Sequence, residues 1–321
     1  MSPGDRARAQ QLDSTLQVYE STQRALPGIR DAARRKTFVE QLTESIRRIK
    51  YITLISTRTI SPLRADPTSD YFDPLKAALL HKRHDNIDEA FWLVFLSVHF
   101  GRHRRGGWRL CRDVYAGPGP AAWWTWKRIT SDLQGFRTWL ATQATAWKSD
   151  GVIRRFGNHH KYQSLDAWTK NGTGAAVESY VQWVRRHHNH IGLIADAQKQ
   201  VGNIPRDVFE YLYTSMDAVA SFGRTAKFDC LTMVGKMALA PIEPGKTYLS
   251  GATGPLRGAR LLFADDPDAT VVPPKMDRLT SARMEEWLVQ LGAILDVGMQ
   301  ELEDALCNWQ KSPDKFVSFR G

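Results

Sequence analysis

The sequence predicts a mainly helical, all-α protein. Apolar residues recur at helical spacing along most of the 321 residues, and few stretches alternate with the period of two that a strand requires. Glycine and proline clusters, such as Gly106-Gly107 and Pro118-Gly119-Pro120, separate the helical stretches. Hydrophobic residues make up 42% and charged residues 24%, so a disordered or collagen-like chain is excluded.

The N-terminal part carries two amphipathic stretches. Leu12, Leu16 and Tyr19 mark the first, and apolar residues between Phe38 and Ile52 continue the pattern after a Pro27-Gly28 break. We interpret the basic residues of this part as a solvated helix face, with phosphate contact as the alternative. We expect residues 1–60 to be a helical segment packed on or flanking the core, and residues 61–321 to be the main domain.

The remaining helices follow in order. Helices are expected at 72–81, 86–100, around Trp123, Trp124 and Trp126, and at 131–147, 175–186, 205–221, 225–239 and 281–309. The run 259–263 is strand-like but isolated, and no internal repeat is visible. Residues 240–258 are rich in glycine and proline, which predicts a long loop of the kind that often carries function.

Charge and aromatic content favour a polyanionic partner. The formal net charge is +10, and the chain has 11 Trp, 13 Phe and 9 Tyr residues, whose flat rings beside cations suit base stacking. Three cysteines without close spacing exclude a four-thiolate metal site and argue against a disulfide framework. The apolar run 90–98 is about half a membrane span. A soluble, reduced, cytoplasmic protein is expected.

Two basic motifs are candidates for nucleic-acid contact. Residues 98–109 combine four arginines with three glycines and Trp108, which suits close approach to phosphate, although a solvated turn fits equally well. Residues 154–162 include Asn158, whose amide suits a Watson–Crick edge, and the pair His159-His160. A polar pocket loop and plain surface both fit this second motif. The histidine tract 187–190 reads as a helix C-terminus with only a weak metal signal, and no metal is expected.

A helix pair joined by a glycine-centred turn is the most informative feature. The turn at 221–226 precedes a helix whose positive N-terminus, with outward backbone N–H groups, can hold a DNA phosphate. Asp229 lies one turn into that helix, where its carboxylate can oppose a developing sugar cation. A first-turn partner of the helix dipole is the alternative interpretation of Asp229.

Several blocks together resemble the α-glutamyl/putrescinyl thymine pyrophosphorylase family, third clade. The blocks are AFWLVFLSVHFG at 90–101, FGNHHKY at 156–162, FGRTAKFD at 222–229, GATGPLRGAR at 251–260 and the closing residues 303–321. The similarity covers about residues 50–321. This family is grouped with the helix-hairpin-helix DNA glycosylases, and its members resemble the Brig (bacteriophage replication inhibition) glycosylases.

The resemblance implies a fold of two helical lobes with a cleft between them, and a monofunctional DNA glycosylase that needs no cofactor. This sequence departs from the better-known helix-hairpin-helix glycosylases, in which the hairpin reads Gly-x-Gly and a catalytic Asp follows well downstream. Here Ser221 takes the first Gly position, and the next loop contains Glu243 but no Asp. Asp229 is therefore the first choice of catalytic acid, with Glu243 in reserve. Arg224-Thr225 stands where a lyase lysine would be expected.

The expected site has three groups of residues. Asp229 and Asn158 are catalytic, and the substrate-base pocket comprises Tyr162, His159, Phe156, Trp92 and Phe228. The expected DNA contacts are Arg102, Arg104, Arg105, Lys161, Phe222, Gly223, Arg224, Thr225 and Arg257.

The expected activity is excision of α-glucosyl-hydroxymethylcytosine from double-stranded phage DNA, which leaves abasic sites and defends the cell. The resemblance implies no membrane and no obligate protein partner. The alternatives are a transferase or pyrophosphorylase-like enzyme that modifies hydroxymethyl-pyrimidines in DNA, and a non-catalytic DNA-binding protein.

Overall fold

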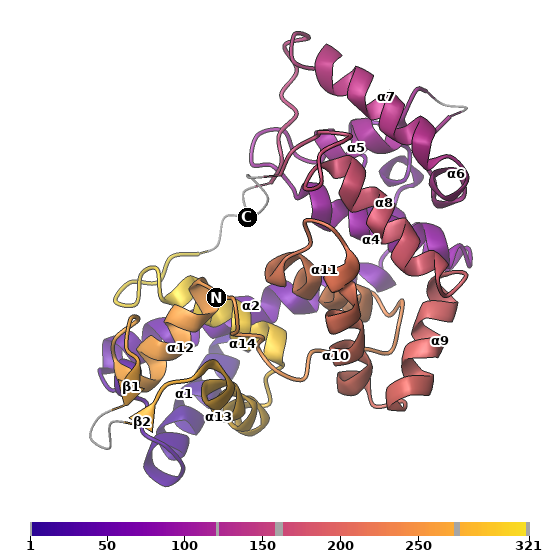
Figure 1. Ribbon diagram of the computed structural model, residues 1–321. Coiled ribbons are helices and arrows are strands. Elements are labelled where there is room, and N and C mark those ends of the chain that lie inside the picture. The colour runs from indigo at the N-terminus through magenta and orange to yellow at the C-terminus, as the bar shows by residue number, and fades with distance from the viewer. Residues whose placement is uncertain (1, 120–121, 158–162, 273–276, 319–321) are drawn as a thin grey trace. The chain divides into compact units, whose positions relative to one another are not determined.

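Figure 1 shows the computed structural model, which describes residues 2–119, 122–157, 163–272 and 277–318. Within these ranges the chain is mostly helical, which confirms the predicted all-α class. The described elements are fourteen α-helices, three short 3-10 helices and one pair of two-residue antiparallel strands. None of the described helices combines the length and the apolar character that a bilayer crossing requires.

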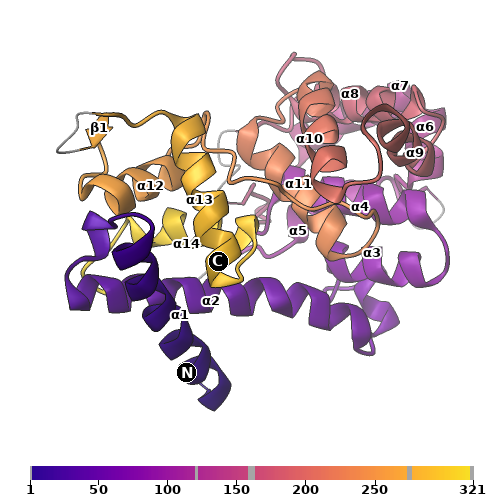
Figure 2. The ribbon, with the colours of Figure 1, turned by 90° about the horizontal axis from the view of Figure 1, so that it is seen from below.

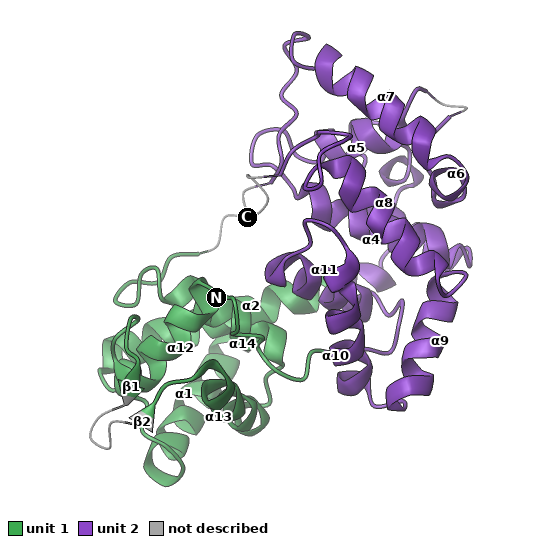
Figure 3. Cartoon of the chain, in the orientation of Figure 1, with its two compact units in different colours: residues 1–53, 244–320 green, residues 54–243, 321 purple. Residues whose placement is uncertain are grey.

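The chain divides into two compact units (Figure 3). Unit 1 contains residues 1–53 and 244–320, and unit 2 contains residues 54–243 together with 321. The expected boundary at residues 60 and 61, and the expected cleft between two lobes, stay predictions. The elements of unit 1 are α1 (Pro3–Thr22), most of α2 (Ala32–Thr57), α12 (Gly254–Ala264), β1 (Val271–Val272), β2 (Asp277–Arg278), α13 (Ser281–Leu295) and α14 (Met299–Trp309).

Unit 2 holds the end of α2 and nine further helices. They are α3 (Pro74–Arg83), α4 (Ile87–Phe100), α5 (Arg109–Ala116), α6 (Trp126–Ser131), α7 (Leu133–Ala146), α8 (Thr173–Arg185), α9 (His190–Val201), α10 (Pro205–Ser215) and α11 (Arg224–Lys236). The start of α3 follows from its sequence. Asp73 Oδ1 accepts hydrogen bonds from the N–H groups of Leu75 and Lys76, each at 3.2 Å, and Pro74 takes the first helical position.

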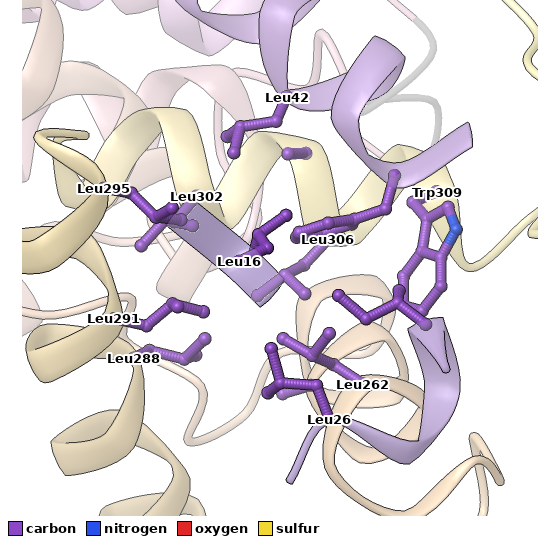
Figure 4. Packing of buried hydrophobic residues seen from close by; sticks show 14 of the residues in the cluster. Leu16, Leu26, Leu42, Leu262, Leu288, Leu291, Leu295, Leu302, Leu306 and Trp309 are labelled. Carbon is purple, nitrogen blue, oxygen red and sulfur yellow. The ribbon is translucent and has the colours of Figure 1, made fainter. Parts of the chain in front are cut away.

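Leucine side chains from five helices form the core of unit 1 (Figure 4). The leucines are Leu16 of α1, Leu42 of α2, Leu262 of α12, Leu288 and Leu291 of α13, and Leu302 and Leu306 of α14. All of them are 0–1% exposed, and burying one such side chain is worth about 2 kcal/mol. This core is therefore built from both ends of the chain.

Basic residues of α2 are engaged in ion pairs within unit 1. Arg34 contacts Asp265 and Asp314, each at 2.6 Å, and Arg35 contacts Asp13 at 2.9 Å. The interpretation of these two arginines as a merely solvated face is therefore wrong. Their carboxylate partners lie far away in sequence, so the pattern along α2 alone could not reveal them.

Three local predictions need correction. The expected helix 281–309 is two helices, α13 and α14, because Asp296 takes a left-handed conformation (φ +51°) and Gly298 caps the second helix. The strand-like run 259–263 lies in α12, where Ala259, Leu262 and Phe263 are buried at helical spacing. The long loop expected at 240–258 therefore ends where α12 begins.

The tryptophan-rich helix is shorter than expected, and helices α5 and α9 were not expected at all. Thr125 caps α6 by accepting from Arg128 N at 3.4 Å, so Trp123 and Trp124 precede the helix. The signal of α9 in the sequence is Asn189, whose Oδ1 accepts from Gly192 N at 2.8 Å as an N-cap.

Helix α4 is the most buried element of unit 2 and packs against α3, α5, α6, α9 and α11. Its apolar run 90–100 lies inside. The ring of Phe95 stacks on Tyr180 of α8 with 3.9 Å between the ring centroids. The expected helix over 86–100 is confirmed, with Asn86 at its N-cap and Gly101 (φ +63°) ending it.

A fully buried histidine joins three helices of this core. His190 of α9 lies 2.6 Å from Asp88 Oδ1 through its Nδ1 and 2.8 Å from the hydroxyl of Tyr180 through its Nε2. Burial lowers the pKa of His190 despite the nearby Asp88 carboxylate, so the neutral ring donates to Asp88 and accepts from Tyr180. A structural role accounts for His190, and His187 is paired with Asp196 at 2.8 Å.

Glu89 is a buried carboxyl group in the same core. It is 3% exposed, and its two oxygens accept from the Tyr115 hydroxyl at 2.7 Å and from Trp126 N at 2.8 Å. Burial raises the pKa of Glu89 from 4.5 to about 7, against the effect of these two hydrogen bonds. Ionising this group in the folded protein is therefore costly.

We predict that the free energy of unfolding of Glu89→Gln, measured relative to that of the wild type, rises as the pH is raised from about 5 to about 9. The folded pKa of about 7 lies above the ordinary 4.5, so the contribution of Glu89 is fully present below 4.5 and is lost as pH rises through 7. Glutamine stays neutral, so the difference should change by on the order of 3 kcal/mol. Urea unfolding at both pH values measures it, and parallel profiles would refute it.

Candidate nucleic-acid interface

Helices α10 and α11 follow one another in the chain and pack together as a hairpin in unit 2 (Figure 2). Pro205 takes the first position of α10, which ends at Ser215 rather than at the expected Ser221. A single 3-10 turn at Met216–Ala218 follows, and α11 begins at Arg224. The rings of Phe209 and Phe228 meet edge to face with 6.2 Å between centroids and hold the two helices together.

The turn of the hairpin is tied to the loop before α8. Ser221 has a left-handed backbone (φ +63°), a conformation that favours glycine. Its hydroxyl donates to Asn171 O at 2.8 Å, and its carbonyl accepts from Gln163 Nε2 at 3.2 Å. These bonds explain how serine replaces the first glycine of the Gly-x-Gly pattern, because they offset the backbone strain.

Phe222 anchors the turn to the core. Its side chain is 5% exposed and stacks on Phe95 of α4 with 4.9 Å between ring centroids. The ring is therefore covered by protein, and the expectation that Phe222 contacts DNA is wrong for its side chain. Its contribution is to fix the position of the residues that follow it.

Gly223 leaves the N-terminus of α11 open. It occupies the N-cap position, is exposed, and a Cβ atom added to it would meet no atom within 4 Å. A glycine N-cap supplies no side chain to the first-turn N–H groups, which lie at the positive end of the helix dipole. Thr225 beside it is exposed, and the guanidinium of Arg224 lies 4.9 Å from the ring centre of Phe228.

Asp229 lies on the accessible side of α11. Most residues of this helix are buried, whereas the less buried Thr225, Asp229 and Met233 recur every four residues and so form one stripe. Asp229 itself is half-buried. Its charge reaches the neighbouring thiol, because burial and then Asp229 raise the pKa of Cys230 to about 12.

A buried lysine on α11 was not anticipated from the sequence. Lys227 is 7% exposed, forms an ion pair with Asp217, and lies 4.1 Å from the ring centre of Tyr213. Lys227 thereby connects α11 to α10 and to the turn that follows α10. Nothing in the spacing of these residues distinguishes such a lysine from a solvated one.

The reserve acid Glu243 lies on an exposed surface. Its side chain is 57% exposed and contacts Arg206 Nε at 3.1 Å, beside the start of α10. An exposed, paired carboxylate is less suited to general acid–base work than one in a partly desolvated position. The surroundings of Glu243 therefore favour the half-buried Asp229.

The arginine motif forms a closed turn after α4. His103 and Gly107 pair as an antiparallel bridge, and His103 Nδ1 accepts from Gly106 N at 3.0 Å. Gly107 has φ +57°, which favours glycine at this position. The turn borders a groove of about 590 Å³ whose lining includes Arg64, Arg102, Arg105, Trp108, Arg109 and Arg112.

The arginines of this turn differ in their partners. Arg109 and Arg112 contact Asp70 at 3.5 and 2.6 Å. Arg102, Arg104 and Arg105 are exposed and form no ion pair with any residue that the structure describes. These three guanidinium groups remain available for an anion.

The expected base pocket is only partly described. Trp92 and Phe228 are each 1% exposed, so their rings are core packing and the expectation that they line a base pocket is wrong. Phe156 is half-buried, and its ring centre lies 5.6 Å from that of Phe100. The predicted site residues Asn158, His159, Lys161 and Tyr162 lie outside the described residues.

The remaining predicted contact lies in unit 1. Arg257 of α12 forms an ion pair with Asp268. Among the described residues no group of three or more His, Cys, Asp or Glu side chains could hold a metal ion. None of the three cysteines, all within the described residues, forms a disulfide.

These features define a helical protein in which two packed helices, α10 and α11, and a separate arginine turn belong to one unit. Residues 33–321 match the family model of alpha-glutamyl/putrescinyl thymine pyrophosphorylase, clade 3, and the chain belongs to this family. Membership identifies it as a relative of enzymes that modify DNA bases. No curated protein and no solved structure matches the chain significantly.

We predict that Ser221→Val destabilises the protein by about 2 kcal/mol, because a β-branched residue is strained at positive φ and the bond to Asn171 is lost. Ser221→Gly should stay within about 1 kcal/mol of the wild type, since glycine adopts this conformation without strain. Urea unfolding compares the two variants. Equal losses of unfolding free energy in Ser221→Val and Ser221→Gly would show that backbone strain does not matter at this position.

Proposed function

We propose that the protein is a DNA glycosylase that excises a modified base, α-glucosyl-hydroxymethylcytosine, from phage DNA and leaves abasic sites in defence of the cell. One observation carries the proposal. The N-terminus of α11, with its exposed N-cap Gly223, and the half-buried Asp229 on the accessible stripe belong to one helix. Membership of a family of base-modifying enzymes supports the choice of DNA as substrate.

The phosphate site is the end of α11. An exposed glycine N-cap permits close approach of a backbone phosphate, and the first-turn N–H groups and the helix dipole favour its charge. Because Phe222 is stacked on Phe95 and Ser221 is tied to Asn171, this site keeps one geometry before DNA arrives. Preorganisation of this kind lowers the entropic cost of binding.

The catalytic step uses Asp229. Asp229 lies six positions after Gly223, which is about 9 Å along the helix axis. The carboxylate therefore faces the sugar of a nucleotide that neighbours a phosphate held at Gly223. Ionised Asp229 stabilises the oxocarbenium ion that forms as the bond from C1′ to the base nitrogen breaks.

Water completes the reaction. A water molecule adds its oxygen to C1′ and gives up one proton to Asp229. This proton then passes to the ring nitrogen of the departing base, which returns Asp229 to its ionised form. Hydrolysis by this route requires no oxidant, reductant or second substrate. The products are the free modified base and an abasic deoxyribose.

The remaining residues hold and read the DNA. Arg102, Arg104 and Arg105 neutralise phosphates beside the site, while the target base is flipped out at a cost of a few kcal/mol. Reading of the flipped base by Asn158, together with Tyr162, stays a prediction from the sequence. The same holds for contacts from His159 and Lys161.

A second candidate activity follows from the family description, which names a pyrophosphorylase. In that reaction an amine displaces pyrophosphate from an activated hydroxymethyl-pyrimidine in DNA, and the base stays attached to its sugar. Asp229 would then accept the proton of the attacking amine. The two activities differ in whether the C1′ bond to the base breaks.

We predict that the purified protein releases bases from glucosylated phage DNA, seen as strand breaks after alkali treatment. Asp229→Asn should lower the rate at least about 100-fold, because a neutral amide neither stabilises the sugar cation nor takes up a proton. Asp207→Asn is the matched control. Asp207 is an exposed carboxylate in the first turn of α10 and should be dispensable.

Three other outcomes would replace the proposal. A gain in base mass without alkali-sensitive sites supports the transferase activity. Retarded DNA with neither change supports a DNA-binding protein without catalysis. Loss of excision in Glu243→Gln with full activity in Asp229→Asn would move the catalytic acid to Glu243.

We predict that Gly223→Asp weakens DNA binding about tenfold without loss of fold stability. Aspartate at an N-cap bonds the first-turn N–H groups, and its charge repels a phosphate at the same place. Gly223→Ser caps the helix without adding a charge, so its affinity for DNA should lie between those of the wild type and Gly223→Asp. Fluorescence anisotropy with labelled duplex DNA gives the affinities and thermal unfolding the stability. Unchanged affinity in Gly223→Asp would rule out a phosphate at this position.

A further inference from the structure

A second groove in unit 2 combines tryptophans with cations. It has a volume of about 710 Å³ and lies along the end of α7 and two loop segments, 154–155 and 164–168. Its lining includes Trp147, Lys148, Arg154, Arg155, Asp166 and Trp168. None of these residues belongs to the hairpin or to the arginine turn.

Trp168 is exposed but held in place. Its side chain is among the most exposed of the large apolar residues, at 52%. Asp166 Oδ1 accepts from the N–H groups of Trp168 and Thr169, each at 2.7 Å, which fixes the turn that carries the ring. The guanidinium of Arg137 lies 4.9 Å from the ring centre. An indole fixed in this way offers a flat surface at little cost in conformational entropy.

Arg137 is itself immobilised. Its Nε donates to Ala167 O at 2.8 Å, and it forms an ion pair with Glu178 of α8. The guanidinium group therefore supports the indole and is not available to neutralise a ligand. The exposed half of Trp168 is the part that a ligand can reach.

The cations of the groove fall into two classes. Arg154 contacts Asp113 and Asp150, each at 2.5 Å, and lies 4.7 Å from the ring centre of Trp147. Lys148 and Arg155 are exposed and form no ion pair with any residue in the described ranges. Asp166 is the single carboxylate of the lining, and its pKa is lowered by the backbone N–H groups it accepts from.

An unpaired nucleic-acid strand matches this arrangement. Its bases have flat faces that stack on an exposed indole, and its phosphates suit two free cations. Duplex DNA hides its base faces within the stack, so it cannot use Trp168 in this way. A purely apolar protein partner would leave Lys148 and Arg155 without counter-charges.

We propose that this groove binds single-stranded DNA, with one base stacked on Trp168 and the adjoining phosphates at Lys148 and Arg155. The site lies on the same loop as the groups that hold the hairpin turn, since Gln163 and Asn171 flank residues 164–168. A strand opened next to a flipped nucleotide is one source of such a segment. Binding here requires no excision, so the proposal stands independently of the glycosylase activity.

The test uses the full chain and unmodified oligothymidine carrying a fluorescent label, with binding followed by anisotropy. Trp168→Ala is expected to weaken binding about 10-fold, and Trp168→Phe, which keeps a stacking ring, by less than about 3-fold. Arg155→Glu should also weaken binding about 10-fold and reduce its salt dependence. All three variants alter exposed side chains, and thermal unfolding confirms that they fold.

Lys199→Glu is the matched charge control, because Lys199 is an exposed lysine of α9 outside the groove. It should leave affinity for oligothymidine within about 2-fold. The proposal fails if the wild type does not bind the oligonucleotide, if Trp168→Ala binds as tightly as the wild type, or if Lys199→Glu weakens binding as much as Arg155→Glu. A duplex of the same sequence that responds equally to Trp168→Ala would also overturn it.

Discussion

The stacking of Phe222 on Phe95 is the contact on which the candidate site depends. It joins the hairpin turn to the most buried helix of unit 2, with 4.9 Å between the ring centroids. A phosphate site made of backbone N–H groups has no adjustable side chains, so its geometry is set by how the turn is held. The bonds of Ser221 to Asn171 and from Gln163 restrain the same turn from the other side. Binding geometry here is a consequence of core packing.

Much of the fold was predictable because it rests on periodicity. Helix α4 is an apolar run of helical length that is buried all round, α11 leaves one less buried stripe, and the caps of both are visible in the sequence. The break at Asp296 was not predictable, since the apolar pattern continues through it and only the left-handed backbone reveals it. The run 259–263 was wrongly predicted as strand-like, because a short apolar segment fits a strand and a buried helix equally well.

The candidate site was predictable only in part, because partners and burial are tertiary properties. The hairpin and its glycine follow from local sequence, as does an acid one turn further along the helix. Aromatic content, by contrast, could not separate a stacking surface from a core. Trp92 is sealed inside unit 2, whereas Trp168 is exposed, although the residue type is the same. Equally, charge alone could not tell the free Arg105 from Arg34, whose partners lie more than two hundred positions away.

Unit 1 is discontinuous in sequence, and this has a consequence for biosynthesis. Its leucine core needs α1 and α2 from the start of the chain and α12, α13 and α14 from its end. On the ribosome, residues 54–243 can fold while the first two helices still lack their partners, because domains form as units during translation. The nascent chain therefore exposes apolar faces of α1 and α2 until α12, α13 and α14 have been synthesised. Chaperone dependence during expression should accordingly arise from the two ends of the chain rather than from its middle.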